Sequence, residues 1–140
     1  MIDHFHGEYR FLSNFFAAPV AMYGLLYPTT EHAFQAAKSL DPNERERIRL
    51  TKTPGQAKRM GRSVTLRPDW NEFRLIAMRE LLRRKFAIPY LREHLVATHP
   101  QTLVEGNTWG DRFWGVCDRK GENHLGRLLV EIREELMASR

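Results

Sequence analysis

The residues of this sequence that could do chemistry are carboxylates set among aromatic side chains. Glu31 directly follows a Tyr-Pro-Thr-Thr segment in a stretch that is rich in aromatic residues. A second segment, residues 103–115, combines two carboxylates, two tryptophans and three glycines. Its side chains of interest are Glu105, Asp111, Trp109 and Trp114. Because aromatic rings stack on planar heterocycles and carboxylates serve sugar chemistry, this composition is typical of a pocket for a base joined to a sugar.

Three of these residues also have a plain structural explanation. An acidic residue in the first turn of a helix, where we expect Glu31, complements the helix dipole. Asp111 can cap a turn, and Trp114 can anchor a core. The residue pattern alone leaves both explanations open.

Other familiar catalytic and metal-binding patterns are missing from the sequence. It has no standard phosphate-cradling glycine loop, no His-Glu-x-x-His and no Cys-x-x-Cys. Cys117, the one cysteine, follows an apolar Phe-Trp-Gly-Val run, which predicts an inert buried thiol. His4 and His6 lie two residues apart near the N-terminus, a spacing that rarely marks a metal site. We therefore expect neither a bound metal nor a disulfide within the chain.

The length and composition indicate one folded domain over residues 1–140. The chain is 42% hydrophobic and contains 15 Phe, Tyr and Trp residues, enough to build a core. No apolar run approaches the roughly 20 residues that a membrane span needs. The N-terminus also lacks the basic-then-apolar order of a signal peptide. We expect a soluble cytoplasmic protein that is a monomer or a weak homo-oligomer.

The charge of the chain is basic and unevenly placed. Lys and Arg number 22 and Asp and Glu number 17, for a formal net charge of +5. Most of the excess lies between Asp41 and Arg62, where seven basic residues face three acidic ones. This distribution predicts a preference for anionic partners.

The elements that must position these residues are mainly helical. We expect a small hairpin at residues 18–27, with Gly24 at its turn, and short extended pieces before it. Hydrophobic spacing and cap residues then predict six helices. Their expected ranges are 30–40, 43–50, 54–61, 69–86, 89–95 and 123–137. Two short strands are expected at 102–104 and 113–116, so the predicted class is α+β, a single mainly helical domain with a small β-sheet.

The order of motifs resembles the NADAR or YbiA-like family from about residue 5 to residue 137. The opening motifs are Phe11-Leu12-Ser13-Asn14-Phe15 and the run from Tyr27 to Lys38. The later motifs are Ala57-Lys58-Arg59-Met60-Gly61-Arg62, Arg67-Pro68-Asp69-Trp70, Lys85-Phe86, Leu103-Val104-Glu105, Asp111-Arg112-Phe113-Trp114-Gly115 and Asn123-His124-Leu125-Gly126. The chain departs from the family at Ile88-Pro89, where the family has an Asn, and this departure puts a helix cap in doubt.

The resemblance implies a YbiA-like fold and an N-glycosidase activity without metal or cofactor. Some members of the family cleave the N-glycosidic bond of phosphorylated ribosylamino intermediates of riboflavin biosynthesis. Others remove ADP-ribose from guanine bases in DNA or RNA. Three functions are therefore open: the first activity, the second activity, or a non-catalytic module that binds ADP-ribose or a nucleotide. The partner would be a phosphorylated base-ribose molecule or ADP-ribosylated nucleic acid, and no membrane is implied.

The resemblance also implies roles for individual residues. Glu31 and Asp111 would be the catalytic carboxylates, with Glu105 as the reserve, because the reaction passes through a ribose cation. The residues implied in substrate binding fall into three groups by chemistry. They are Trp109 and Trp114 for stacking on the base, Arg10, Lys38, Lys58 and Arg62 for the phosphate, and Asn14 for the ribose or base.

Overall fold

The computed structural model describes residues 1–139 and divides them into two compact units. Residues 14–85 form the hairpin unit, and residues 1–13 together with those from Phe86 onward form the terminal unit. About half of the chain is helical, and its sheet has two antiparallel strands. The α+β class with a small sheet is therefore confirmed, and a single domain over residues 1–140 stays a prediction.

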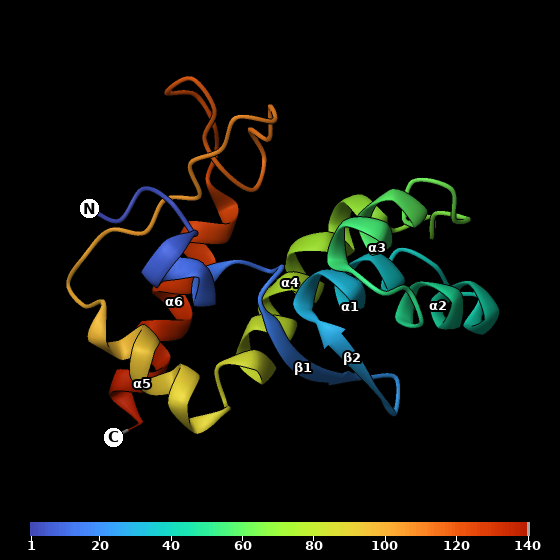
Figure 1. The fold of residues 1–140 in the computed structure, drawn as a ribbon, viewed down its shortest axis with the longest axis horizontal. Coiled ribbons are helices and arrows are strands. Elements are labelled where there is room, and N and C mark those ends of the chain that lie inside the picture. Colours follow the sequence, from blue (N-terminus) through green and yellow to red (C-terminus); the bar gives the residue numbers. More distant parts are fainter. Residues whose placement is uncertain (140) are drawn as a thin grey trace. The chain divides into compact units, whose positions relative to one another are not determined.

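The hairpin of residues 14–85 consists of β1 (Ala17–Met22) and β2 (Leu25–Thr29), as predicted (Figure 1). Tyr23 and Gly24, the two residues between the strands, both have positive φ angles of 53° and 76°. Two positive φ angles in a two-residue loop match the twist of antiparallel strands. The register shifts between Ala17 and Val20, next to a proline that cannot donate to the ladder.

Four helices complete the hairpin unit: α1 (Thr30–Ala36), α2 (Pro42–Arg49), α3 (Pro54–Met60) and α4 (Trp70–Lys85). Thr29, Asp41 and Thr53 cap the first three, since each side chain accepts a hydrogen bond from a backbone N–H in the first turn. Helix α1 contacts β2 and all three other helices, and it lies beside the hairpin in Figure 1. It is therefore the central element of this unit.

Helix α1 is shorter than the predicted range of residues 30–40, because it ends at Ala36. The carbonyl oxygens of the next turn bond outside the helix. The backbone N–H of Arg67 donates to the Lys38 carbonyl at 2.7 Å, and Arg45 Nε donates to the Ser39 carbonyl at 2.7 Å. Pro42 also disfavours helical angles at the residue before it.

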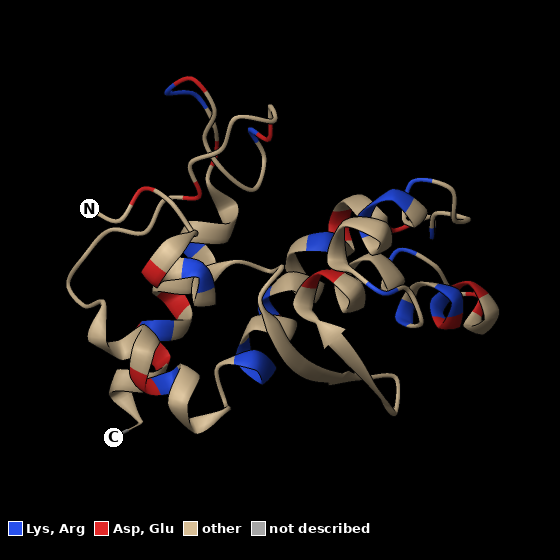
Figure 2. Cartoon of the chain, viewed as in Figure 1, with Lys and Arg blue, Asp and Glu red and all other residues tan. Residues whose placement is uncertain are grey.

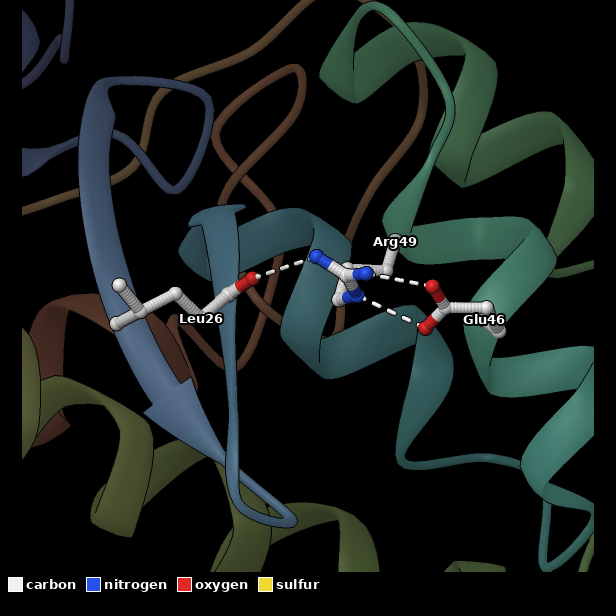
Figure 3. Close-up of polar contacts among 3 residues, drawn as sticks. All are labelled: Leu26, Glu46 and Arg49. Carbon is white, nitrogen blue, oxygen red and sulfur yellow. Dashed lines mark hydrogen bonds and ion pairs between the residues drawn. The ribbon is translucent and has the colours of Figure 1, made fainter.

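Arg49 connects α2 to the hairpin (Figure 3). Its Nε donates to Glu46 Oε2 at 2.8 Å, and its Nη1 donates to the Leu26 carbonyl at 3.4 Å. The hydrogen bond from Arg49 lowers the pKa of Glu46. Because these groups are near the surface, the contact orients α2 more than it stabilises the fold.

The terminal unit contains a short 3-10 helix, η1 (Gly7–Leu12), and the helices α5 (Pro89–Ala97) and α6 (His124–Ala138). The prediction of extended pieces was wrong at η1, while α5 and α6 agree with the predicted helices. Leu91 and Leu95 of α5 and Leu125 and Leu129 of α6 are fully buried. Ile88 provides no side-chain cap to α5, as the departure at Ile88-Pro89 indicated.

The strands expected at residues 102–104 and 113–116 are not formed. Leu103 makes a single parallel bridge with Ile2, and Val116 makes one with Gly106. Side chains take the backbone groups that a strand would use. Asn123 Oδ1 accepts from the N–H of Glu105 at 3.0 Å, and its Nδ2 donates to the Leu103 carbonyl at 3.0 Å. The segment is therefore a loop held by side-chain amides and carboxylates.

Within residues 1–139, no helix combines the length and the apolar character that crossing a membrane requires.

The two hydrogen bonds of the Asn123 amide should contribute measurably to the free energy of unfolding. The Asn123 backbone is left-handed, with φ 54°, which asparagine tolerates better than alanine. We expect Asn123→Ala to lower the free energy of unfolding by about 3 kcal/mol, because two hydrogen bonds and the backbone preference are lost together. Asn123→Gly keeps the backbone freedom and should lose about 2 kcal/mol in denaturant unfolding.

Asn71→Ala, on the exposed side of α4, is the control and should change stability by less than about 0.5 kcal/mol. An Asn123→Ala protein as stable as the parent would show that the loop does not depend on this amide.

Candidate active site

Helix α1 is buried on every side, although four of its seven residues are polar. Thr30, Glu31, His32 and Gln35 are all at most 7% exposed. Buried polar side chains must find hydrogen-bond partners inside the protein, or they destabilise it. The partners of these side chains define the surroundings of Glu31.

Glu31 is held at both its backbone and its side chain. Its N–H, near the start of α1, donates to the Asn14 carbonyl at 3.0 Å. Its Oε1 accepts from Gln35 Nε2 at 2.9 Å, one turn further along the helix. The Leu-Ser-Asn motif is thus fixed against the beginning of α1.

Asn14, whose carbonyl accepts from the Glu31 N–H, also has a side-chain amide with a buried oxygen. Its Nδ2 donates to Met78 Sδ of α4 at 3.6 Å. Its Oδ1 is buried and has no hydrogen-bond partner among residues 1–139. A buried acceptor without a partner is the kind of group that a ligand hydroxyl or amine can satisfy.

Lys38 lies close enough to Glu31, and to the other predicted phosphate-binding residues Lys58 and Arg62, for their charges to act on it. Burial lowers the pKa of Lys38, and the negative charge of Glu31 opposes this change. The positive charges of Arg62 and Lys58 lower the pKa of Lys38 further. Lys38 follows α1, while Lys58 and Arg62 come from α3 and the residues after it. The structure therefore brings one carboxylate and three cations together.

The hydrogen bonds of His32 define the tautomer of its neutral imidazole. Because the Thr51 carbonyl can only accept, His32 Nε2 carries the proton and donates to it at 3.1 Å. His32 Nδ1 then accepts from the Thr29 hydroxyl at 2.8 Å, and that hydroxyl accepts from the His32 N–H at 3.1 Å. Burial lowers the pKa of His32.

Lys85 is a buried lysine that was not among the predicted site residues. It is completely buried in the last turn of α4, and burial lowers its pKa to about 7. Its Nζ lies 5.7 Å from the centre of the Phe16 ring. A lysine at the end of a helix ordinarily complements the helix dipole from the surface. Only the Lys-Phe motif set this one apart.

Asp111, in the terminal unit, caps a turn. Its Oδ1 accepts from the N–H groups of Phe113 at 3.1 Å and Trp114 at 2.8 Å. Asn107 brackets it, since the Asp111 N–H donates to Asn107 Oδ1 and Asn107 Nδ2 donates to the Asp111 carbonyl. Asp111 Oδ2 makes no hydrogen bond within residues 1–139. The structural explanation of Asp111 is therefore correct, and its catalytic role stays a prediction.

The remaining candidates of the terminal unit differ in their exposure. Glu105 is half-buried and its backbone is fixed by Asn123. Trp114 is half-buried, and its ring is edge-on to that of Phe113 with 4.8 Å between the ring centres. Trp109, in contrast, is 62% exposed. Arg10 is exposed on η1. Cys117 is buried, as predicted.

The terminal unit also has an open cavity of about 480 Å³. Glu8, Tyr9, Glu93 and His94 are among the residues that line it, and none of the predicted site residues does. Within residues 1–139, no three His, Cys, Asp or Glu side chains are grouped so that they could hold a metal ion.

The model of the NADAR domain matches residues 3–137 of this chain. The chain belongs to the NADAR family. The resemblance inferred from its motifs is therefore confirmed. Its YbiA-like fold is confirmed by the NMR structure of the Escherichia coli protein YbiA. That structure superposes with a TM-score of 0.86 at 42% identity over 99% of this chain and 88% of the other.

Curated NADAR relatives carry enzyme names. N-glycosidase YbiA of E. coli is 46% identical over 133 residues, which are 92% of this chain and 82% of that protein. N-glycosidase Npun_R5314 of Nostoc punctiforme is 36% identical, over 91% of this chain and 86% of that protein. Riboflavin biosynthesis protein VVA0006 of Vibrio vulnificus is 34% identical over 96% of this chain and only 36% of its own length. These names confirm the expected N-glycosidase activity at the level of the family.

The buried His32 predicts a loss of stability in mild acid. Well above pH 6.5 the imidazole is neutral in both the folded and the unfolded chain, so it adds no pH dependence. As the pH falls through 6.5 the unfolded chain binds the proton first, because the folded pKa is lowered. We expect the free energy of unfolding to decrease from pH 7.5 to pH 5.5, measured in denaturant.

His32→Gln should weaken this pH dependence, while His6→Gln, at an exposed position, should leave it as in the parent. An unchanged slope in His32→Gln would assign the acid sensitivity to other groups.

Proposed function

We propose that this NADAR protein is an N-glycosidase that hydrolyses phosphorylated ribosylamino intermediates of riboflavin biosynthesis. The observation that carries the proposal is the buried Glu31 beside Lys38, which also lies close enough to Lys58 and Arg62 for their charges to act on it. A carboxylate next to several cations suits a substrate whose reacting sugar carries a phosphate. The names of the E. coli, Nostoc and Vibrio relatives support the reaction and the substrate class.

Hydrolysis breaks the bond between C1′ of the ribose and the nitrogen of the base, and the bonding electrons leave with the nitrogen. Positive charge then develops on the ribose. Glu31, shielded from water and held by Gln35, would stabilise this cation more strongly than a solvated carboxylate could. The oxygen of water bonds to C1′, and a water proton goes to the leaving nitrogen.

The cations would hold the phosphate. Arg62 offers a forked contact to two oxygens, and the lysines act as point charges. A bound phosphate next to Lys38 would favour its ammonium form, opposing the effect that burial has on its pKa. Asn14 Oδ1 would accept from a ribose hydroxyl or from the base.

For the second carboxylate we keep Asp111, with Glu105 in reserve. Asp111 Oδ2 is available to a ligand, because only Oδ1 is used by the turn. Trp109 and Trp114 remain candidates for stacking on the base, and Arg10 for the phosphate. These assignments rest on the motif resemblance and on their surroundings within the terminal unit.

Release of ribose 5-phosphate from the ribosylamino intermediates tests the proposal. We expect Glu31→Gln to lower kcat/KM at least about 100-fold, because the neutral amide no longer stabilises the ribose cation. Glu72→Gln, exposed on α4, is the matched control and should retain full activity. Folded parent protein that releases no ribose 5-phosphate, or full activity in Glu31→Gln, would contradict the proposal.

A second candidate activity is the removal of ADP-ribose from guanine in nucleic acid. The feature that favours it is the basic stretch between Asp41 and Arg62, seen as blue bands along α2, α3 and their loops in Figure 2. Contacts with several phosphates would make binding of a modified oligonucleotide fall steeply with salt. Salt-insensitive binding and no release of ADP-ribose would remove this candidate.

The same assays address a non-catalytic nucleotide-binding module. Such a module would bind ADP-ribose equally well in the parent, Glu31→Gln and Asp111→Asn and would turn over neither substrate.

A further inference from the structure

Gly61, the residue that ends α3, is a glycine for a reason other than its backbone. Its angles are φ −60° and ψ −18°, which any residue adopts. A side chain would nevertheless collide with its neighbour, since a Cβ at Gly61 would lie 1.9 Å from Gln35 Oε1 and 2.8 Å from Gln35 Cδ. Gln35, on α1, is 5% exposed and has little room to move away. The glycine is therefore required by the Gln35 amide that lies against it.

The orientation of this amide is determined by Glu31. Gln35 Nε2 donates to Glu31 Oε1 at 2.9 Å, so Oε1 of the amide faces Gly61. The reversed amide would place its carbonyl oxygen against the carboxylate, which is repulsive. In the observed orientation Gln35 Oε1 has no hydrogen-bond partner among the residues that the structure describes. A buried carbonyl without a partner lowers the stability of the fold. The orientation that leaves it unpaired is also the one that lets Gln35 donate to Glu31.

We propose that Gln35 is a positioning residue for Glu31 and that Gly61 keeps Gln35 in place, an inference that rests on the proposed function. The amide donor fixes the rotamer of the carboxylate before substrate binds. It also favours the ionised carboxylate, because a hydrogen bond donated to the charged form stabilises that form. Gly61 acts indirectly, because its lack of a side chain leaves room for the Gln35 amide.

Loss of the amide donor has two kinetic consequences. The Glu31 carboxylate takes up its proton at a higher pH, so the acidic limb of the plot of kcat against pH moves to higher pH. The carboxylate also loses its fixed direction toward the ribose, which affects the transition state more than substrate binding. A residue with a purely structural role would lower stability and leave the pH profile where it is.

The experiment measures the kcat and KM of folded, full-length variants between pH 4.5 and pH 8, with a phosphorylated ribosylamino substrate. We expect Gln35→Met and Gly61→Ala each to move the acidic limb upward by about one pH unit and to lower kcat about tenfold. KM should change less than about twofold. Gly55→Ala on the same helix is the matched control, because its Cβ would meet only Thr53 Oγ1 at 3.9 Å. It should behave as the parent.

The double variant Gln35→Met/Gly61→Ala distinguishes a shared route from two separate defects. If Gly61 acts through Gln35, the pH shift of the double variant equals that of Gln35→Met alone. Should Gly61→Ala fail to fold, Gln35→Met decides the question, since it removes the amide donor and leaves Gly61 unchanged. An unshifted pH profile in an active Gln35→Met protein overturns the inference. Failure of the proposed function is distinct, because the parent itself would then release no ribose 5-phosphate.

Discussion

The hairpin unit depends on one constraint, which is that α1 is a polar helix surrounded by protein on every side. Burying a threonine, a glutamate, a histidine and a glutamine in a seven-residue helix is costly, and hydrogen bonds to His32, to Glu31 and from the Gln35 amide N–H offset most of this cost. The Thr30 hydroxyl and Gln35 Oε1 have no hydrogen-bond partner among residues 1–139. The solution uses the helix itself and its neighbours. Thr29 and Thr51 bind His32, Gln35 binds Glu31, and the Asn14 carbonyl takes the Glu31 N–H. Because these bonds come from β2, from the loop after α2 and from the segment before β1, they fix the surroundings of the carboxylate.

Electrostatics adds a second reason for this arrangement. One buried carboxylate, Glu31, and three cations give the surroundings of Lys38 an excess of positive charge before any ligand binds. Burial is the main cause of the lowered pKa of Lys38, and the positive charges of Arg62 and Lys58 lower it further. In the proposed function, an incoming phosphate would relieve this repulsion. A phosphorylated ribose would then suit this charge arrangement better than a neutral one.

The sequence predicted elements whose ends carry local signals and missed those that depend on distant partners. Thr53-Pro54 predicts the start of α3, because a cap and a proline act within one turn. Residues 102–104 and 113–116 look like short strands, but the Asn123 amide binds the Glu105 N–H and the Leu103 carbonyl from 18 and 20 residues away. In the site, Glu31 was found through its motif. Gln35 was not, although it lies four residues after Glu31 and therefore on the same face of the helix, because the sequence does not show that this face is buried. Gly61 resembled an ordinary helix terminator, and only its contact with Gln35 shows otherwise.

The two leading candidate carboxylates share one structural device. In each, one oxygen accepts from N–H donors of its own surroundings: Glu31 Oε1 from the Gln35 amide, and Asp111 Oδ1 from two backbone N–H groups. Such donors set the direction of a carboxylate without a ligand, which is what charge stabilisation in a transition state requires. The turn-capping role of Asp111 is thus no argument against a catalytic one. The donors differ in one respect. A backbone N–H is removed only by substitution with proline, which also restricts the backbone, whereas the Gln35 amide can be replaced without a change in the backbone. The contribution of the donor can therefore be separated from that of the carboxylate more cleanly at Glu31.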